Sequence, residues 1–264
     1  MPNKNNSQGF KVYALVDAVT KIAVRLFIYS GKNWKYHENY VPLVNLDKEL
    51  SYSAEHVTIY MIQDYINTFR CIHTDRGFST VPLTISLREN YGLLHIGTAR
   101  QDLHFFPKML KPKRKKPLKT DRGNMRFARN VCRKWLGILE FSDSVNIAFI
   151  SSDVSVKGSE IVRKKRKGGQ VKTSPAVRNK YIDFMSGVDD WDQGLSYTEA
   201  QVKQARKWWH SLWSFLSLDT MTDLTFTIWK LMVTPYVQEE SGITDKRSVL
   251  LTLFEIVRGF CNED

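Results

Sequence analysis

The sequence predicts an α/β protein in which a mixed sheet is flanked by helices and interrupted by a small β-rich insertion. Three observations lead to this fold class. Strand-length apolar segments recur through the first hundred residues, and segments with helical spacing of apolar side chains lie between them. The chain has 264 residues, 42% of them hydrophobic, so it is long enough to bury a sizeable core. A change of composition after residue 101 marks the insertion.

The first hundred residues contain the expected sheet and its helices. Residues 11–32 have the pattern of two strands around a tight turn, and Asp17 ends the first of them. Both faces of that first strand are largely apolar, as expected inside a covered sheet. The further expected elements are, in order, a short strand near 40–43, a helix over 54–69, a strand over 71–74 that enters Asp75, a helix from about 79 to 90 and a strand over 91–98. This order is typical of a mixed sheet with helices packed against it.

The second half of the chain is expected to differ in character from the first. Residues 102–174 contain short β-like segments over 125–130, 135–141 and 145–150, flanked by basic loops. The pattern from Pro175 onward is helical, with helices expected over 206–233 and 245–259. We therefore divide the chain into 1–101, the first part of the core; 102–174, the β-rich insertion; and 175–264, the helical second part of the core.

The charge balance favours an anionic partner. Lys and Arg outnumber Asp and Glu by 39 to 27, which gives a net charge of +12. A polyanion such as DNA is the usual partner of so basic a protein. A basic protein with no special partner is the alternative, because net charge describes attraction and not a specific site.

Cysteine usage and hydropathy exclude several classes of protein. Cys71, Cys132 and Cys261 are far apart, which argues against a disulfide framework or a self-contained structural zinc site and favours a reducing compartment. The N-terminus lacks the apolar core of a signal peptide. No apolar run approaches the ~20 residues that a membrane-spanning helix needs, so we expect no membrane partner.

Five aspartates mark the candidate chemistry. Asp17 and Asp75 lie at expected strand ends, and Asp189, Asp190 and Asp192 lie within four positions at the mouth of a helix. Carboxylates that gather at a sheet edge can hold the two divalent cations of a phosphoryl-transfer site, and Mg²⁺ prefers such oxygen ligands. The alternative is surface charge, with Asp189 and Asp192 stabilising a helix start. Asp190 is expected to be solvated.

Five short motifs surround the candidate aspartates. They are Leu-Val-Asp17-Ala-Val-Thr, Tyr29-Ser-Gly-Lys, His-Thr-Asp75-Arg-Gly-Phe-Ser-Thr, His95-Ile-Gly-Thr-Ala-Arg, and Met185-Ser-Gly-Val-Asp-Asp-Trp-Asp-Gln. In their order and separations they resemble motifs in the catalytic region of piggyBac-type DNA transposases and their domesticated relatives. The resemblance covers roughly residues 5–258.

This resemblance implies a ribonuclease-H-like core interrupted by an insertion domain before the last acidic motif. It implies that Asp17, Asp75 and Asp189 are catalytic and hold two Mg²⁺ ions, with Asp192 as a fourth carboxylate. It further implies strand cleavage and transfer on double-stranded DNA, with transposon ends and TTAA targets as partners, a nuclear location, and a homodimer as one assembly.

Two basic runs are candidate DNA contacts. The charged residues that they contribute are Lys111, Lys113, Arg114, Lys115, Lys116, Arg163, Lys164, Lys165, Arg166 and Lys167. Each phosphate neutralised by such side chains would make binding more salt-sensitive. Nuclear-import signals and plain solvated loops are the alternatives.

Departures from the family pattern favour a second hypothesis. Arg76 replaces an asparagine after the second aspartate, where its guanidinium would compete with Mg²⁺ for Asp75 or lower the effective charge of that carboxylate. Ser186 replaces a glycine, a milder change. The family's N-terminal DNA-binding region and C-terminal cysteine-rich module are absent from the sequence, so we expect a truncated or decayed copy. A catalytically inactive, transposon-derived DNA-binding or interaction protein is therefore the alternative function.

Overall fold

The computed structural model of the chain describes most of its middle and parts of both ends. The described residues are 11–29, 53–103, 105–111, 118, 120, 122–153, 160–163, 172–196 and 208–232. The chain divides into two compact units, Gly31–Met185 and Met1–Ser30 with Ser186–Asp264. No helix among the described residues is long and apolar enough to cross a membrane.

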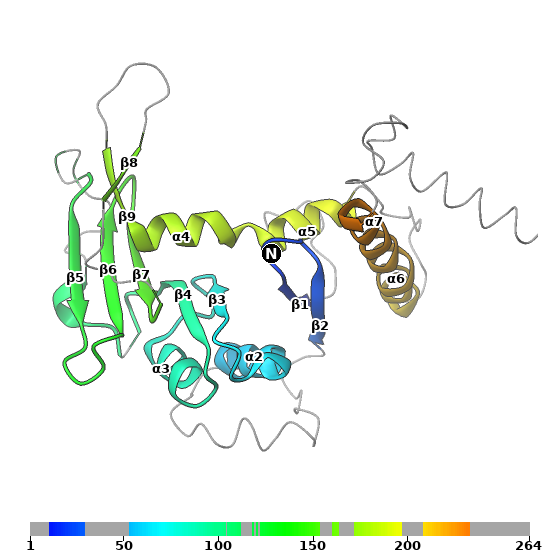
Figure 1. Ribbon diagram of the computed structural model, residues 1–264, viewed down its shortest axis with the longest axis horizontal. Coiled ribbons are helices and arrows are strands. Elements are labelled where there is room, and N and C mark those ends of the chain that lie inside the picture. The colour runs from blue at the N-terminus through cyan, green and yellow to red at the C-terminus, as the bar shows by residue number, and fades with distance from the viewer. Residues whose placement is uncertain are drawn as a thin grey trace, which may run out of the picture. The chain divides into compact units, whose positions relative to one another are not determined.

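A five-stranded mixed sheet forms the centre of the larger unit, with the strand order β3-β4-β7-β6-β5 (Figure 1). Its strands are β3 (Cys71–Thr74), β4 (Leu94–Ala99), β5 (Met125–Arg129), β6 (Gly137–Ser142) and β7 (Asn146–Ser151). Strands β3 and β4 run parallel, because the chain crosses between them through helix α3 (Val81–Glu89). The other neighbours in this sheet are antiparallel. The expected mixed α/β sheet is thereby confirmed.

Both faces of this sheet are apolar and covered. Alternate side chains of a strand point to opposite faces, so Ile138 and Leu139 belong to different clusters. One cluster includes side chains of helix α4 (Ala176–Met185), and its buried members are Ile96, Leu139, Phe141, Phe149, Val177 and Tyr181. The other adjoins α3, and its buried members are Ala99, Phe106, Leu110, Leu136, Ile138, Ala148 and Ile150. This two-sided burial explains why every residue of β6 is buried, whereas β5, at the edge of the sheet, is partly exposed.

The helices of the larger unit begin and end for local reasons. Thr80 has an extended backbone and its Oγ1 accepts a hydrogen bond from the backbone N–H of Leu83, so it caps α3, with Pro82 in the first turn as expected. Helix α2 (Ser53–Ile62) is shorter than the predicted 54–69 and passes into a 3₁₀ turn. Asn67 and Phe69 have φ values of 60° and 54°. A right-handed helix cannot continue through such a conformation.

Strands from the predicted insertion, residues 102–174, pair with a strand of the predicted core. Strand β7, from within 102–174, pairs with β4, so β5, β6 and β7 continue the sheet that β3 and β4 begin. The physical reason is that β6 and β7 share both apolar clusters with β4. Strands β8 (Glu160–Arg163) and β9 (Lys172–Pro175) form a separate hairpin. The strand predicted near 40–43 lies outside the described residues.

The smaller unit contains a hairpin and helices. Strands β1 (Lys11–Val16) and β2 (Ala23–Tyr29) pair antiparallel in their own two-stranded sheet. The expectation that the first strand lies inside the covered mixed sheet is therefore wrong. Among the described strands β1 pairs with β2 alone, and its side chains are only partly buried. Helix α5 (Gly187–Ser196) contacts β1, and α7 (Thr220–Met232) contacts α5. Helix α6 (Trp208–Ser214) reaches α7 through a π-helical segment, Phe215–Asp219. Helical structure is thus confirmed over most of 206–233, while 245–259 lies outside the described residues.

Candidate active site

Asp17 organises the turn that joins β1 to β2. Its Oδ1 accepts hydrogen bonds from the backbone N–H of Val19 at 2.9 Å and of Thr20 at 2.7 Å, and from Thr20 Oγ1 at 3.0 Å. Aspartate commonly closes turns in this way. The strand register shifts between Leu15 and Val16, immediately before the turn, and such bulges re-aim neighbouring side chains. The turn therefore holds the Asp17 carboxylate in one orientation.

The turn that carries Asp17 is fastened to the start of α5, the helix that carries Asp189 and Asp192. Lys21 Nζ lies 2.8 Å from Asp190 Oδ2, and Ser186 Oγ donates a 2.9 Å hydrogen bond to the same oxygen. Gly187 lies so close to the turn that a Cβ there would be 3.3 Å from Ala18 Cα. Asp190 is exposed, but it is ion-paired and not simply solvated as predicted.

This fastening predicts a measurable shift in acidity. The Lys21 hydrogen bond, followed by that of Ser186, lowers the pKa of the Asp190 carboxyl. Lys21→Gly removes the ammonium and suits the local φ of 62°, so we expect it to raise the pKa of Asp190 towards its ordinary value. Ser186→Gly should raise it less. Carboxyl NMR titration measures both, and an unchanged pKa in Lys21→Gly would contradict the ion pair.

Asp75 follows β3 in the larger unit and is exposed. Its backbone carbonyl accepts hydrogen bonds from the N–H groups of Phe78 and Ser79 at 3.0 and 3.2 Å. Its side-chain Oδ1 accepts one from Thr98 Oγ1, on neighbouring β4, at 3.3 Å. A turn at the end of a parallel strand, braced by the next strand, thus presents this carboxylate at the sheet edge.

Arg76 follows Asp75 in the turn and is exposed. Within the described part of the chain, no ion pair joins the two side chains. The pKa of nearby Asp102 is lowered to about 2, first by the hydrogen bond from Arg100 and with a smaller contribution from the charge of Arg76. The predicted competition between Arg76 and Mg²⁺ for Asp75 stays a prediction.

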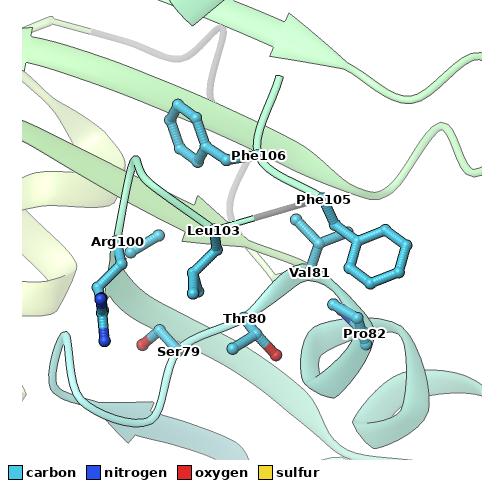
Figure 2. A pocket seen from close by; sticks show the side chains of 9 residues that line it. Ser79, Thr80, Val81, Pro82, Arg100, Leu103, Phe105 and Phe106 are labelled. Atoms are coloured by element: carbon cyan, nitrogen blue, oxygen red, sulfur yellow. The ribbon is translucent and has the colours of Figure 1, made fainter. Parts of the chain in front are cut away.

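A pocket adjoins the Asp75 turn (Figure 2). The start of α3 and the segment after β4 form its walls, which are mainly apolar. The lining residues are Ser79, Thr80, Val81, Pro82, Ala99, Arg100, Leu103, Phe105 and Phe106. Arg100 donates to both carboxylate oxygens of Asp102, at 3.1 and 2.6 Å. No carboxylate is among these described lining residues.

The comparisons with known proteins decide the family. The model of the family described as Transposase IS4 matches residues 1–222, which include all five candidate aspartates. The chain belongs to this transposase family. Its fold is similar to that in a cryo-EM structure of a piggyBac transposase synaptic complex with hairpin DNA, with a TM-score of 0.71 and 19% sequence identity. The match covers 94% of this chain and 46% of that one, so the chain spans less than half of its relative. No curated protein matches the chain.

The four predicted metal ligands of this transposase-family chain come from both units. Asp17, Asp189 and Asp192 belong to the smaller unit and Asp75 to the larger one. Asp75, Asp189 and Asp192 are exposed and Asp17 is half-buried, so hard oxygen donors of the kind that suit Mg²⁺ are present. Among the residues that the structure describes, no three His, Cys, Asp or Glu side chains form a group able to hold a metal ion. The metal-binding set stays a prediction.

The predicted DNA contacts fall mostly where the structure says nothing. Lys111 is exposed, and its carbonyl accepts a hydrogen bond from Arg126. The remaining candidates of the first run lie outside the described residues, as do Lys164, Lys165, Arg166 and Lys167; Arg163 ends β8. These positions stay predictions.

Three titratable groups lie at the base of the Asp75 turn: His95 is buried, and His73 and Cys71 are half-buried. Sequence reasoning did not single out His95. Burial lowers the pKa of His95 to about 3 and that of His73 to about 4, and raises that of the Cys71 thiol to about 12. His73 lies against the ring of Phe184, at 5.3 Å between centroids. His95 lies in an apolar strand, where its position alone gives no sign of its contacts.

The low pKa of His95 predicts acid-sensitive folding. An unfolded chain protonates this histidine near pH 6.5, whereas the folded chain does so only near pH 3. Acidification therefore favours the unfolded state. The stability that the neutral, buried His95 contributes to the folded state is complete above pH 6.5 and is lost as the pH falls towards 3. Between pH 7 and pH 5 we expect His95 to cost ~2 kcal/mol of unfolding free energy. Urea unfolding at both pH values, compared with His95→Gln, measures it; equal losses in the two proteins would refute the assignment.

Proposed function

We propose that this chain is the catalytic part of a metal-dependent DNA transposase that cleaves and transfers DNA strands. The family match over residues 1–222 carries the proposal, because it spans every predicted catalytic aspartate. The similarity in fold to a piggyBac transposase supports a ribonuclease-H-like core. Double-stranded DNA is the proposed substrate, with transposon ends and TTAA sites as targets, a homodimer as the assembly and the nucleus as the location.

The proposed ligands are Asp17, Asp75 and Asp189, with Asp192 beside them. Mg²⁺ bound there would supply a Lewis acid for the attacking and leaving oxygens of the phosphodiester. Other groups of the chain orient these carboxylates. The turn bonds of Asp17 fix its carboxylate, and Thr98 braces that of Asp75. Positioning and charge neutralisation account for much of the rate in phosphoryl transfer, so these tethers matter for catalysis.

The basic runs at 111–116 and 163–167 are proposed to bind the DNA backbone. Their lysines and arginines would neutralise phosphates, and this would make affinity fall steeply with salt. The chain carries a net charge of +12, which supports attraction to a polyanion over a long range. These contacts would position the duplex and would not read its sequence.

Cleavage of DNA by the purified chain tests the proposal. A duplex that carries a transposon terminal repeat next to a TTAA site should be nicked in the presence of Mg²⁺ and left intact in EDTA. Calorimetric titration with Mg²⁺ alone provides a second readout that does not depend on choosing the correct DNA. Salt-sensitive duplex binding without Mg²⁺ binding would instead support the inactive, DNA-binding alternative, which the charge of Arg76 beside Asp75 favours.

A further inference from the structure

A buried polar network lies beneath the Asp75 turn. It joins the end of β3, the start of α3 and the start of β4, all within the larger unit. Its side chains are Thr74, Ser79, Thr84 and His95, with Ser152 bound to the backbone of β4. Polar groups are costly to bury unless they are paired, so a network of this size in an apolar core requires a reason.

His95 is the centre of the network. Its side chain is fully buried, and each ring nitrogen has a threonine hydroxyl as its partner. Nε2 lies 2.8 Å from Thr74 Oγ1, and Nδ1 lies 2.8 Å from Thr84 Oγ1. The backbone N–H of His95 donates to Ser152 Oγ at 2.9 Å, and its carbonyl accepts from the N–H of Ser152. The imidazole is therefore fixed in position and in ring orientation.

From Thr74 the contacts lead to the backbone of the turn. Thr74 Oγ1 lies 2.6 Å from Ser79 Oγ, and Ser79 Oγ lies 3.1 Å from the carbonyl oxygen of Asp75 and 3.2 Å from that of Thr74. The space beside Gly77 at the tip of the turn is open, since a Cβ placed there would meet no atom within 4 Å. The contacts at the base of the turn therefore act on the orientation of Asp75 together with the hydrogen bond from Thr98.

Hydrogen counting gives the path a direction. The network has five links that each need one hydrogen. Two join the imidazole to Thr74 and Thr84. The others join Thr84 to the Thr80 carbonyl, Thr74 to Ser79, and Ser79 to the Asp75 carbonyl. A neutral imidazole and three hydroxyls supply four hydrogens. A path that ends on the Asp75 carbonyl requires the proton on Nε2, donation from Thr74 to Ser79, and donation from Ser79 to the turn. In this arrangement the Thr84 hydroxyl hydrogen points to Nδ1 and no longer to the Thr80 carbonyl, 2.8 Å from Thr84 Oγ1. That carbonyl keeps its bond from the N–H of Thr84.

We propose that His95 is a positioning residue for Asp75, and that the path from His95 through Thr74 and Ser79 fixes the turn so that the Asp75 carboxylate is presented for metal binding. The metal-binding part of this inference rests on the proposed function; the fixing of the turn does not. Groups that orient a metal ligand are commonly worth 10–100-fold in affinity.

Two matched variants separate positioning from folding. Thr74→Val and Thr84→Val each remove one hydroxyl from one nitrogen of the same imidazole, so they should destabilise the fold to a similar extent. Thr74 alone of the two connects to the turn. We expect Thr74→Val to raise amide hydrogen exchange at Phe78 and Ser79, whose N–H groups bind the Asp75 carbonyl, by about tenfold more than Thr84→Val does. Thr74→Ser, which restores the hydroxyl, should restore protection.

The same variants test the link to metal. Mg²⁺ titration should give a dissociation constant raised about tenfold or more in Thr74→Val and little changed in Thr84→Val. Equal changes of exchange in the two variants would overturn the proposal, and so would an Nδ1–H tautomer of His95 in its ¹⁵N spectrum. If Thr74→Val does not fold, Ser79→Ala breaks the path one step later and carries the same expectations. A wild-type chain that binds no Mg²⁺ would refute the proposed function while leaving the exchange result as a test of the turn.

Discussion

Asp189→Asn is expected to reduce Mg²⁺-dependent strand cleavage by at least about 10²-fold, the order of loss seen when a group that stabilises charge in the transition state is removed. The carboxylate of Asp189 is exposed at the start of α5. Replacing it by an amide removes a negative oxygen donor for the cation and hardly changes the size of the side chain. The initial rate of nicking of a terminal-repeat duplex at saturating Mg²⁺ measures the effect.

Asp190→Asn is the matched control for this prediction. Asp190 is the next residue on the same helix, and its carboxylate is engaged by Lys21 and Ser186 and is not a proposed metal ligand. Its loss should therefore leave cleavage within a few-fold of wild type, since exposed ion pairs contribute little. Equal cleavage by Asp189→Asn and the wild-type chain would contradict the metal role of Asp189.

Asp17→Asn separates two roles of another predicted ligand. The Oδ1 atom of Asp17 accepts three hydrogen bonds that hold its turn together. Asparagine keeps an oxygen acceptor at this position and closes turns as aspartate does, so the turn should survive while the charge is lost. We expect cleavage to fall as in Asp189→Asn with little change in the unfolding midpoint. Asp17→Ala would remove both roles and could not separate them.

Local signals in the sequence were sufficient for the elements that depend on local chemistry. The segment that contains Pro82 predicted the start of α3, because an early proline suits a helix start. The capping role of Thr80 was found only in the structure. Apolar segments predicted β5, β6 and β7 to within a few residues. The helix expected over 54–69 ended early because of left-handed residues that apolar spacing does not reveal.

Contacts between residues that are distant in the sequence were harder to predict from the sequence. Whether β7 would pair with β4 or form a separate domain depends on which strand edges meet, and alternating side chains do not specify a partner. The aspartates of the candidate site could be named because they end or begin elements. The bond from Lys21 to Asp190 and the contacts of His95 join segments from different elements, and no local pattern marks them.

Gly97→Ala is expected to be the most destabilising single substitution at the base of the Asp75 turn. Gly97 lies on β4 opposite Thr74 of β3. A Cβ at Gly97 would lie 2.0 Å from Ser79 Oγ, 2.8 Å from the carbonyl oxygen of Thr74 and 2.9 Å from Thr74 Oγ1. The carbonyl belongs to the backbone of a paired strand, so it can move away only if β3 and β4 separate. Overpacking of this kind typically costs about 1–3 kcal/mol, and we expect a loss of about 3 kcal/mol in unfolding free energy.

Gly77→Ala provides the control for Gly97→Ala, because it adds the same methyl group to the tip of the same turn, where no atom lies within 4 Å. Its unfolding free energy should stay within about 0.5 kcal/mol of wild type. Ser79→Gly introduced beside Gly97→Ala removes the nearest clashing atom and leaves the carbonyl of Thr74 in place, so recovery should be partial. Urea unfolding of the four proteins measures these differences. Equal stability of Gly97→Ala and Gly77→Ala would show that β4 does not approach the Asp75 turn closely, and the hydrogen-bond path from His95 to that turn would then lose its structural basis.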